Sequence, residues 1–303
     1  MKHVKIAIIG AGAVGSTTAY ALMLRNIAAE IMLVDINDLR CQGELLDLSD
    51  TLPFCASSNI HIGTAQEARD ADIIIFSAGI SQKPGQTRLD LLTKNKEVVA
   101  AAFASLQPIN PQAIIIMVTN PNDILTYQAQ QLSGLPRNQL FGTGTFMDSL
   151  RLRGAIAQKL QVAQESIHAY VLAEHGDTQF AAWSCAMVAG IPLRSLPGIT
   201  QKDLDSFEKQ THQKAYDIIS CKGSTYYGIA ACVTVMCESI IFDQKQVLPL
   251  SSFIPEFGVC LSLPSVLGEQ GIERIMPISL DDKEQERLQQ SAQMLKKMID
   301  QQL

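Results

Sequence analysis

The most informative residues of this chain lie in two short segments that together supply a histidine, a carboxylate and an arginine. Glu174-His175-Gly176-Asp177 carries the histidine, and Asp148-Ser149-Leu150-Arg151 carries the other two groups. A histidine beside a carboxylate can pass a proton to a carbonyl oxygen, because the carboxylate raises the imidazole pKa and orients the ring. An arginine can hold a carboxylate through two parallel hydrogen bonds. The set predicts a site that protonates a carbonyl while gripping a carboxylate.

A glycine-rich turn near the start of the chain indicates a second reactant. Residues 4–9 are a β-branched run typical of a buried parallel strand, and the turn at residues 10–15 (Gly-Ala-Gly-Ala-Val-Gly) follows it directly. Gly10 can make the tight turn, Gly12 lets the backbone approach a pyrophosphate, and Gly15 allows close helix–strand packing. The N-terminus of the following helix would then meet the phosphates. The pattern predicts a dinucleotide-binding turn.

Asp35 ends the next predicted strand and indicates which dinucleotide binds. A carboxylate at this point would bond both hydroxyls of the adenosine ribose and would repel a 2′-phosphate, which favours NAD over NADP. The alternative is a plain βαβ turn in which Asp35 caps a helix. With a proton donor and an anion clamp elsewhere in the chain, a nicotinamide cofactor predicts reversible reduction of a 2-oxo acid.

Length, composition and charge limit the classes of protein to which this chain can belong. The 303 residues are 47% hydrophobic and 18% charged, so we expect a globular protein that can bury two cores and form two domains. The formal net charge of −6, without any basic run, argues against nucleic acid and anionic membrane as partners. An anionic substrate must then be attracted locally, by a few buried arginines rather than by the overall field.

The cysteines and the N-terminus indicate the compartment. Seven cysteines form no C-x-x-C pair, so we expect neither a disulfide framework nor a metal site, but reduced thiols in a cytoplasm. Met1-Lys2-His3 runs directly into a strand without a leader, and no apolar run approaches the roughly 18 residues of a membrane span. We expect a soluble, cytoplasmic protein.

Strands and helices alternate through the first half of the sequence. Apolar runs near residues 31–34, 72–76 and 113–118 continue the pattern that residues 4–9 begin, with helices between them. This alternation predicts an α/β fold with a Rossmann-type doubly wound parallel sheet. We assign residues 1–143 to an NAD-binding domain and residues 144–303 to an α+β substrate domain.

The second half gives weaker local signals. We predict a helix over 146–160, which places Asp148 and Arg151 on one face, and one strand over 167–172 leading to His175. Residues 247–263 read as short strands broken by Pro255 and Gly258. Near the C-terminus, the pair Ser279 and Asp282 resembles a capping box before an amphipathic helix.

Five blocks, in order along the chain, carry a resemblance to a known family. The sequence resembles the lactate branch of the lactate/malate dehydrogenase family from its first strand to its C-terminal helix. The blocks are Gly10–Gly15, Ala78–Asp90, Asn120-Pro121, Asp148–Arg151 and Glu174–Asp177.

The resemblance assigns a role to each candidate catalytic residue. His175 would be the acid/base, with Asp148 holding its ring, and Arg151 would bind the substrate carboxylate. Arg88, beyond the loop of residues 81–86, would polarise the carbonyl oxygen after loop closure, and Asn120 would bond the same oxygen. Each residue also has a plainer reading: a structural histidine, a helix-capping aspartate or asparagine, and surface arginines.

Two further residues would determine the substrate. Thr225 resembles the threonine that walls the pocket for the substrate side chain, although its segment could also be only a helix start. Gln82 matches the position where the malate branch carries an arginine that pairs with a second carboxylate. Because Gln82 is neutral, oxaloacetate would leave a buried carboxylate unpaired, so pyruvate should be preferred. Gln82 could instead be an ordinary loop residue, with specificity set elsewhere.

The resemblance also implies the cofactor contacts. The expected cofactor is NAD. The residues expected to contact it, some of which serve the substrate as well, are Gly10, Gly12, Val14, Gly15, Asp35, Arg40, Gly79, Val118 and Asn120.

Arg153 and His168 suggest regulation. They fall where allosteric family members bind fructose 1,6-bisphosphate between subunits, and both side chains suit phosphate. The resemblance thus implies a homotetramer with a possible sugar-bisphosphate effector. The alternative is a second helix arginine and an ordinary strand histidine.

The chain departs from the family pattern at several points. Gln86 replaces a usual acidic loop residue, Ala173 replaces the glycine before Glu174-His175, and Asp50 replaces a frequent histidine. The segment around Gly258 is a few residues short. None of these changes removes a catalytic group.

Two alternatives to pyruvate reduction remain open at this point. One is an enzyme for malate or a larger 2-hydroxy acid. The other is a catalytically idle NAD-binding structural protein, since a fold alone confers no activity. The presence of His175, Asp148, Arg88 and Arg151 argues against an idle protein.

Overall fold

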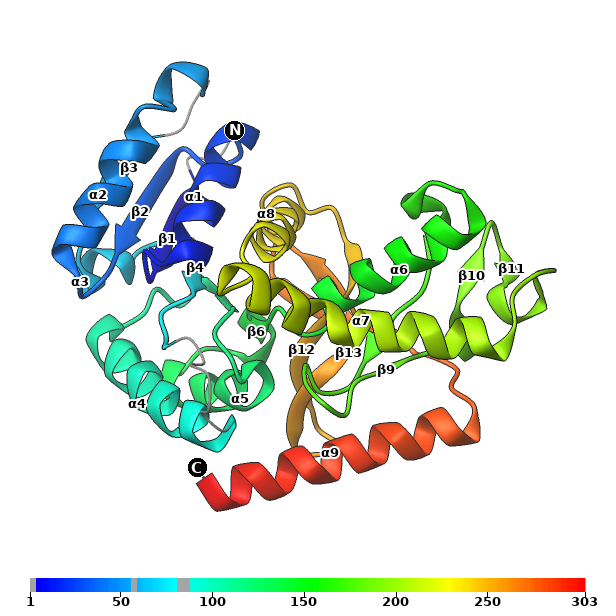
Figure 1. The fold of residues 1–303 in the computed structure, drawn as a ribbon. Coiled ribbons are helices and arrows are strands. Elements are labelled where there is room, and N and C mark those ends of the chain that lie inside the picture. Colours follow the sequence, from blue (N-terminus) through cyan, green and yellow to red (C-terminus); the bar gives the residue numbers. More distant parts are fainter. Residues whose placement is uncertain (1–3, 56–58, 81–87, 303) are drawn as a thin grey trace.

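The structure is a computed structural model that describes residues 4–55, 59–80 and 88–302, without the side chains of residues 88–90. Within these residues, nine strands form one sheet in the order β14-β13-β12-β6-β5-β4-β1-β2-β3 (Figure 1). Its strands are β1 (Lys5–Ile9), β2 (Glu30–Val34), β3 (Asn59–Ile62), β4 (Ile73–Phe76), β5 (Ile114–Met117), β6 (Leu140–Gly142), β12 (Gln246–Ile254), β13 (Val259–Gly268) and β14 (Gly271–Ile275).

The six strands from β6 to β3 pair in parallel, which confirms the predicted doubly wound fold. From β1 the chain moves outward to β2 and β3, then returns to β4 on the other side of β1 and continues to β5 and β6. The strand order therefore reverses between β1 and β4. Ligands of open α/β sheets bind outside the carboxyl ends of the strands at such a point.

Helices cover both faces of this sheet. They are α1 (Ala13–Arg25), α2 (Asp38–Ser49), α3 (Ala65–Ala68), α4 (Arg88–Leu106), α5 (Asn122–Ser133), α6 (Phe146–Leu160), α7 (Gln201–Lys222), α8 (Tyr227–Ile241) and α9 (Asp282–Gln302). Short 3-10 turns are η1 (Leu52–Phe54), η2 (Arg137–Gln139), η3 (Gln164–Ser166), η4 (Trp183–Cys185) and η5 (Leu193–Ser195).

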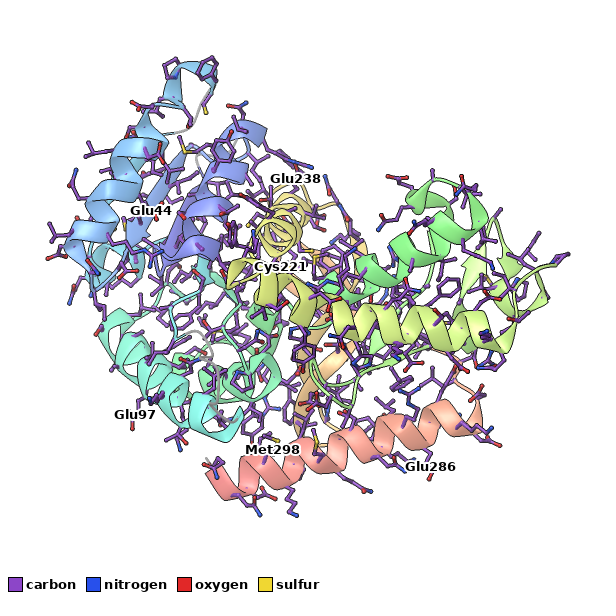
Figure 2. The ribbon with its side chains drawn as sticks, in the orientation of Figure 1. Glu44, Glu97, Cys221, Glu238, Glu286 and Met298 are labelled. Atoms are coloured by element: carbon purple, nitrogen blue, oxygen red, sulfur yellow. The ribbon has the colours of Figure 1, made fainter. Side chains whose placement is uncertain are left out.

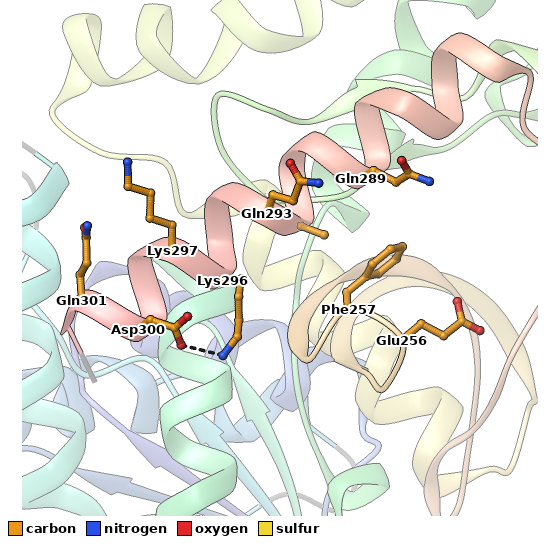
Figure 3. Close-up of a pocket in the computed structure, with 9 residues that line it drawn as sticks. Glu256, Phe257, Gln289, Gln293, Lys296, Lys297, Asp300 and Gln301 are labelled. Atoms are coloured by element: carbon orange, nitrogen blue, oxygen red, sulfur yellow. Dashed lines mark hydrogen bonds and ion pairs between the residues drawn. The ribbon is translucent and has the colours of Figure 1, made fainter.

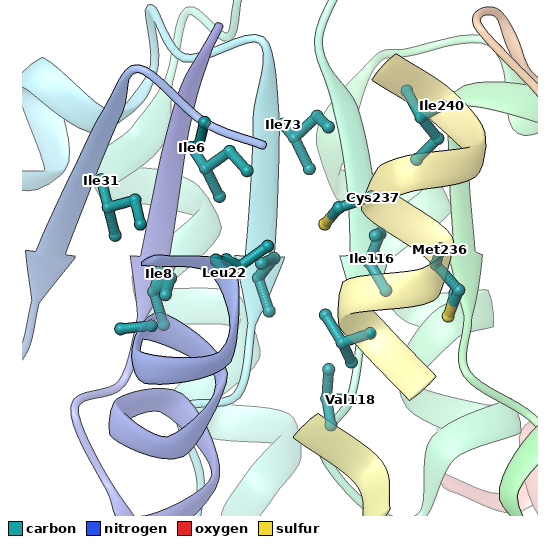
Figure 4. Close-up of a cluster of buried hydrophobic side chains, with 14 of the residues drawn as sticks. Ile6, Ile8, Leu22, Ile31, Ile73, Ile116, Val118, Met236, Cys237 and Ile240 are labelled. Carbon is teal, nitrogen blue, oxygen red and sulfur yellow. The ribbon is translucent and has the colours of Figure 1, made fainter. Parts of the chain in front are cut away.

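The two faces of β1 belong to two different cores, as the alternation of side chains along a strand requires. Ile6 and Ile8 pack in a cluster with residues of α1 and α8, and Figure 4 shows α8 lying over this face. Ala7 and Ile9 pack in a second cluster with residues of α4, α5 and α9. Both clusters take residues from the two halves of the sequence, so the halves share their cores.

A polar contact reinforces the junction of α1 and α8. Arg25, in the last turn of α1, pairs with Glu238 of α8 at 2.7 Å, and Figure 2 labels Glu238 on that helix. Because Arg25 is half exposed, water screens this pair and it contributes little beside the apolar contacts. The buried side chains of the two helices hold α8 on the sheet.

The second half differs from expectation around residues 167–172. The predicted single strand is two short ones, β7 (Ile167–His168) and β8 (Val171–Leu172), in different sheets. β7 pairs with β10 (Met187–Val188), which also pairs with β11 (Ile191–Pro192), whereas β8 pairs with β9 (Phe180–Ala181). The prediction of one strand was wrong because the chain changes partner at Ala169 and Tyr170.

The predicted break at Pro255 and Gly258 within residues 247–263 is confirmed, but the strands on either side are long rather than short. β12 and β13 form one long antiparallel hairpin, with Pro255 and Gly258 in the turn between them. Proline is tolerated inside β12, at Pro249, because β12 pairs with β6 only at Ser251. The hairpin thus extends the parallel sheet of the first half.

The capping box of α9 is formed two residues later than predicted. The backbone N–H of Glu284 donates to Oδ1 of Asp281 at 3.0 Å, and the N–H of Asp281 donates to the Glu284 carboxylate at 3.3 Å. Ser279 and Asp282 do not form it. Asp281 also pairs with Arg194, which fixes the start of α9 against η5.

Candidate active site

Four segments predicted to contact the cofactor lie at the carboxyl ends of neighbouring strands. Gly10 follows β1, Asp35 follows β2, Gly79 lies just beyond β4, and Asn120 lies just beyond β5. Because β2, β1, β4 and β5 are adjacent and parallel, these residues come together at one edge of the sheet. This edge contains the point where the strand order reverses.

The glycine turn has the geometry that each glycine was predicted to provide. Gly10 has φ of +102°, and a Cβ there would lie 2.6 Å from the backbone nitrogen of Ala78. A Cβ on Gly15 would lie 1.9 Å from the Gly10 carbonyl oxygen, so only glycine lets α1 pack this closely. A Cβ on Gly12 would meet nothing within 4 Å. Gly12 thus faces open space at the start of α1, as an approaching phosphate requires.

Asp35 shapes the turn as well as facing the site. Its two carboxylate oxygens accept the backbone N–H of Ala11 at 2.7 Å and that of Asn37 at 2.9 Å. Asn37 in turn caps α2 by accepting the N–H of Arg40 at 3.0 Å. Each carboxylate oxygen has a second lone pair, so Asp35 can accept further hydrogen bonds from a ribose.

Asn95 is a buried residue that sequence reasoning did not identify. Its side chain accepts the backbone N–H of Ile80 at 2.7 Å and donates to the carbonyl of Asn120 at 2.7 Å. It also lies beside Gly79, where a Cβ would come within 3.2 Å of its Oδ1. Asn95 therefore fixes the ends of β4 and β5 relative to α4. An asparagine inside a helix carried no motif signal.

His175 and Arg151 both contact Asp148. Nδ1 of His175 lies 2.7 Å from Oδ2 of Asp148, and Nη1 of Arg151 lies 3.0 Å from Oδ1 of the same carboxylate. Asp148 and Arg151 are in the first turns of α6 and almost completely buried, whereas the His175 side chain is 27% exposed. One carboxylate thus binds the imidazole of His175 and the guanidinium of Arg151 together.

The electrostatics of the cluster favour a charged imidazole. Burial alone would lower the pKa of His175, but the Asp148 carboxylate, through its charge and its hydrogen bond, outweighs burial and raises that pKa above the ordinary 6.5. Burial would raise the pKa of Asp148, but the charge of His175 and the Arg151 guanidinium outweigh it, and the net shift is downward. Both shifts favour the ionised forms of the pair.

The loop that carries His175 is held in an unusual backbone conformation. Ala173, which the sequence analysis noted in place of a glycine, has φ of +75°, a region where L-residues are strained. Two backbone hydrogen bonds with Ser262 of β13, at 3.0 and 2.9 Å, hold it there. Glu174 follows, and its N–H donates to Ser291 of α9 at 3.2 Å.

Arg151 and Thr225 line one cavity of about 430 Å³, and neither His175 nor Asp148 is among its lining residues. Met147, Leu150 and Ile229 add apolar walls, which suits the methyl group of a small substrate. The cavity is bounded by α6, α7 and the start of α8. It is large enough for a three-carbon acid and leaves room for longer side chains.

Some of the predicted residues lie away from the cluster around Asp148, and others have side chains that the structure does not describe. Gln82 lies outside the described residues, and Arg88 begins α4 with its side chain outside them. Arg153 lies on the opposite side of α6 from Arg151, donates through Nε to the Ala169 carbonyl at 2.9 Å, and stacks over the ring of Tyr170.

His168 is exposed on β7, next to the strand end that Arg153 contacts. Val14, Arg40 and Val118 all lie near the glycine turn or the strand ends. The structure therefore brings the predicted cofactor residues to one edge and leaves Arg153 and His168 on another surface.

Asp123 is the second residue that sequence reasoning passed over. Its buried carboxylate accepts the backbone N–H of His175 at 2.7 Å. Asp123 directly follows Asn120-Pro121-Asn122 in the sequence, but this segment by itself indicates only the start of a helix. Its partner is 52 residues away in sequence.

Another cavity, of about 640 Å³, lies between α9 and the turn of the β12–β13 hairpin (Figure 3). Glu256 and Phe257 line it from the turn. Lys296 and Asp300 line it from α9, and their side chains form an ion pair at 2.6 Å. It contains none of the residues of the glycine turn or of the His175 cluster. Arg151 and Thr225 line the smaller cavity instead.

The described residues contain neither a candidate metal cluster nor a candidate membrane-spanning helix. No group of three or more histidine, cysteine, aspartate or glutamate side chains in that part of the chain is arranged to hold a metal ion. Among the helices described, none has both the length and the apolar character needed to cross a lipid bilayer.

Comparison with known families gives matches over nearly the whole chain. The model of the NAD binding domain of lactate/malate dehydrogenase matches residues 4–142, and that of the alpha/beta C-terminal domain of the same family matches residues 145–303.

Individual relatives agree with this. L-lactate dehydrogenase A of Rhizopus oryzae is 42% identical over 97% of this chain and 92% of its own length. L-lactate dehydrogenase of Lacticaseibacillus casei is 39% identical over 98% of this chain and 94% of its own length. Among solved structures, a minor L-lactate dehydrogenase from Enterococcus mundtii in a ligands-bound form has a TM-score of 0.95 at 35% identity, over 99% of both chains.

Because Gly12 and Gly15 have different surroundings, we expect the same substitution to alanine to lower stability at Gly15 and to weaken cofactor binding at Gly12. Gly15→Ala places a methyl against the Gly10 carbonyl and should lower the free energy of unfolding by about 1–3 kcal/mol. Gly12→Ala should change it by less than about 1 kcal/mol, but should raise the Kd for NADH at least about tenfold, because the methyl fills the phosphate approach. Urea unfolding and NADH fluorescence titration measure the two effects. Wild-type NADH affinity in Gly12→Ala would show that the phosphates bind elsewhere.

Proposed function

The chain belongs to the lactate/malate dehydrogenase family, and from that premise we propose that it interconverts pyruvate and L-lactate. Its class is an NAD-dependent oxidoreductase, with NAD held by the domain matched at residues 4–142. The open space at Gly12, the tight turn at Gly10 and the free lone pairs of Asp35 fit this cofactor. NADH, when bound, supplies the hydride that reduces the carbonyl carbon.

The observation that carries the proposal is the carboxylate of Asp148 shared between His175 and Arg151. Asp148 occupies Nδ1 of the imidazole and leaves Nε2 to hold the proton for the substrate oxygen. Because the pKa of His175 is raised, the ring keeps that proton to a higher pH than an ordinary histidine does. In the reverse direction the neutral ring accepts the hydroxyl proton of lactate at Nε2.

The remaining residues bind and orient the substrate. Arg151 holds the carboxylate through its planar fork, and Thr225 borders the pocket for the methyl group. Asn120, exposed beyond β5, and Arg88 donate to the carbonyl oxygen as negative charge develops on it. These contacts fix the carbonyl between the hydride donor and His175.

Where the protein works and whether it assembles are further parts of the proposal. All seven cysteines are unpaired, which suits a reducing compartment, and we place the enzyme in the cytoplasm. Exposed apolar side chains on the first helices, Leu46 (62%) and Phe54 (80%), suit burial against a second copy in a homotetramer. Sedimentation as a monomer at micromolar concentration would contradict the assembly.

Pyruvate turnover tests the proposed activity directly. With NADH the wild type should reduce pyruvate faster than oxaloacetate or 2-oxoisocaproate, measured as kcat/KM from the loss of NADH absorbance. His175→Asn should bind NADH normally but lose at least about 100-fold in turnover, since it lacks the proton donor. Preference for oxaloacetate would favour a malate dehydrogenase, and NADH binding without turnover of any acid would favour an idle binding protein. Near-normal turnover by His175→Asn would overturn the mechanism.

Gln82 sets the choice between pyruvate and oxaloacetate in this proposal. Gln82→Arg should raise the preference for oxaloacetate over pyruvate by roughly two to four orders of magnitude, because a buried charge pair broken at one partner costs about 3–5 kcal/mol. Gln82→Leu, which adds no charge, is the matched control and should not gain oxaloacetate activity. An unchanged substrate ratio in Gln82→Arg would assign specificity to other residues, such as Thr225.

We also propose a sugar-bisphosphate effector at Arg153 and His168. Arg153 retains guanidinium donors beyond the one that binds Ala169, and His168 is exposed beside it, so two facing subunits could hold two phosphates. A ligand bound between subunits would favour one arrangement of α6, which carries Asp148 and Arg151 on its other side.

Fructose 1,6-bisphosphate at millimolar concentration should therefore lower the apparent KM for pyruvate at neutral pH. The double variant His168→Ala/Arg153→Ala should lose this response and keep the wild-type rate at saturating pyruvate. Steady-state saturation curves with and without the bisphosphate measure it. Superimposable wild-type curves would rule out the effector.

A further inference from the structure

A second buried carboxylate contacts the catalytic histidine from its backbone side. Asp123, in the first turn of α5, is 2% exposed. Its Oδ2 accepts the N–H of His175 at 2.7 Å, and its Oδ1 accepts the hydroxyl of Ser251 at 2.5 Å. Asp123 thereby joins α5, the catalytic loop and β12 at one point.

Asp123 differs from Asp148 because, among the described residues, no cationic side chain is directly bound to it. It accepts hydrogen bonds from two neutral donors. It also lies near the amino end of α5, where the helix dipole favours a negative charge. The titratable groups that face it are His175 and Glu174 on the catalytic loop and Cys260 on β13. Burial raises the pKa of Asp123 to about 6, against the opposing effect of its hydrogen bonds with Ser251 and His175.

The placement of Asp123 relates two groups proposed to meet the same substrate atom. Asn120 precedes it by three residues, at the end of β5, and Asn95 anchors the Asn120 carbonyl. His175 is held at both ends, since Asp148 fixes its ring and Asp123 fixes its backbone. The distance between the Asn120 amide and Nε2 of His175 therefore depends on Asp123.

We propose that Asp123 is a positioning residue for proton transfer, which holds the backbone of His175 in register with Asn120. The inference rests on the proposed function of His175. Asp123 is buried behind the backbone of His175, so in this proposal it acts through His175. Its negative charge also adds to that of Asp148 in favouring the protonated imidazole.

The test compares two substitutions of Asp123 with a control on the same helix. Asp123→Asn keeps an oxygen for the His175 N–H but removes the charge, whereas Asp123→Ala removes both. Gln130→Ala is the matched control, because Gln130 is a buried α5 residue that donates to the backbone carbonyl of Leu140 at 2.8 Å, away from His175. All three lose a buried polar contact and should lose stability.

Asp123→Ala should lower kcat for pyruvate by about 100-fold, the effect of displacing a reacting group by about 1 Å, with the Kd for NADH unchanged. Asp123→Asn should recover most of kcat, and its alkaline limb of activity should move to lower pH, because the imidazole loses its proton more easily. Gln130→Ala should keep the wild-type kcat and pH profile.

NMR titration of the His175 ring, assigned with His175→Asn, measures the charge effect without substrate. A lower imidazole pKa in Asp123→Asn supports the proposal. An unchanged imidazole pKa overturns the electrostatic part of the proposal, and this result does not depend on whether Asp123→Ala folds. Equal kcat in Asp123→Ala, Gln130→Ala and wild type would reduce Asp123 to a structural residue. A wild type that fails to reduce pyruvate would refute the proposed function instead, while the titration would still stand.

Discussion

The site depends on one buried carboxylate that is shared between two cations. Asp148 gives one oxygen to the imidazole of His175 and the other to the guanidinium of Arg151. A unit-charge pair at about 4 Å with an effective dielectric near 20 interacts by about 4 kcal/mol, but removing the charges from water costs a comparable amount. The net stability of such a cluster is therefore small, and what it provides is geometry. It sets the distance between the imidazole of His175 and the guanidinium of Arg151.

The scaffold serves this arrangement in two ways. Asp148 lies in the first turn of α6, where the helix dipole favours a negative charge, and Arg151 is one turn further on the same face. The catalytic loop is fixed from behind by Asp123, by the bridge from Ala173 to Ser262, and by Ser291 of α9. The long β12–β13 hairpin supplies Ser251 and Ser262, and it joins the parallel sheet through β6. The cofactor edge and the proton donor are thus parts of one hydrogen-bonded framework.

Local patterns in the sequence were enough to predict the parts of this framework that are local in the structure. The spacing of Asp148 and Arg151 placed both on one face of α6, and the glycine turn at residues 10–15 predicted its own conformation. The roles of Asp123 and Asn95 were missed because each depends on partners brought together only by the tertiary fold. The break at Pro255 and Gly258 was predicted correctly, but the length of β12 and β13 was not, because it depends on the pairing of the two strands with each other and of β12 with β6. The capping box was misplaced by two residues because Ser279 and Asp281 are both acceptable caps.

The central claim is that Asp148 keeps His175 protonated, and the pH dependence of pyruvate reduction tests it most directly. Reduction needs the imidazolium, so kcat/KM should be full below the raised pKa of His175 and fall as pH rises through it, above the ordinary value of 6.5. In Asp148→Asn the negative charge is lost, so the fall should occur at lower pH and the plateau should also be lower, because the ring is less firmly oriented. If the alkaline limbs of wild type and Asp148→Asn coincide, Asp148 does not control the proton of His175 and the account is wrong.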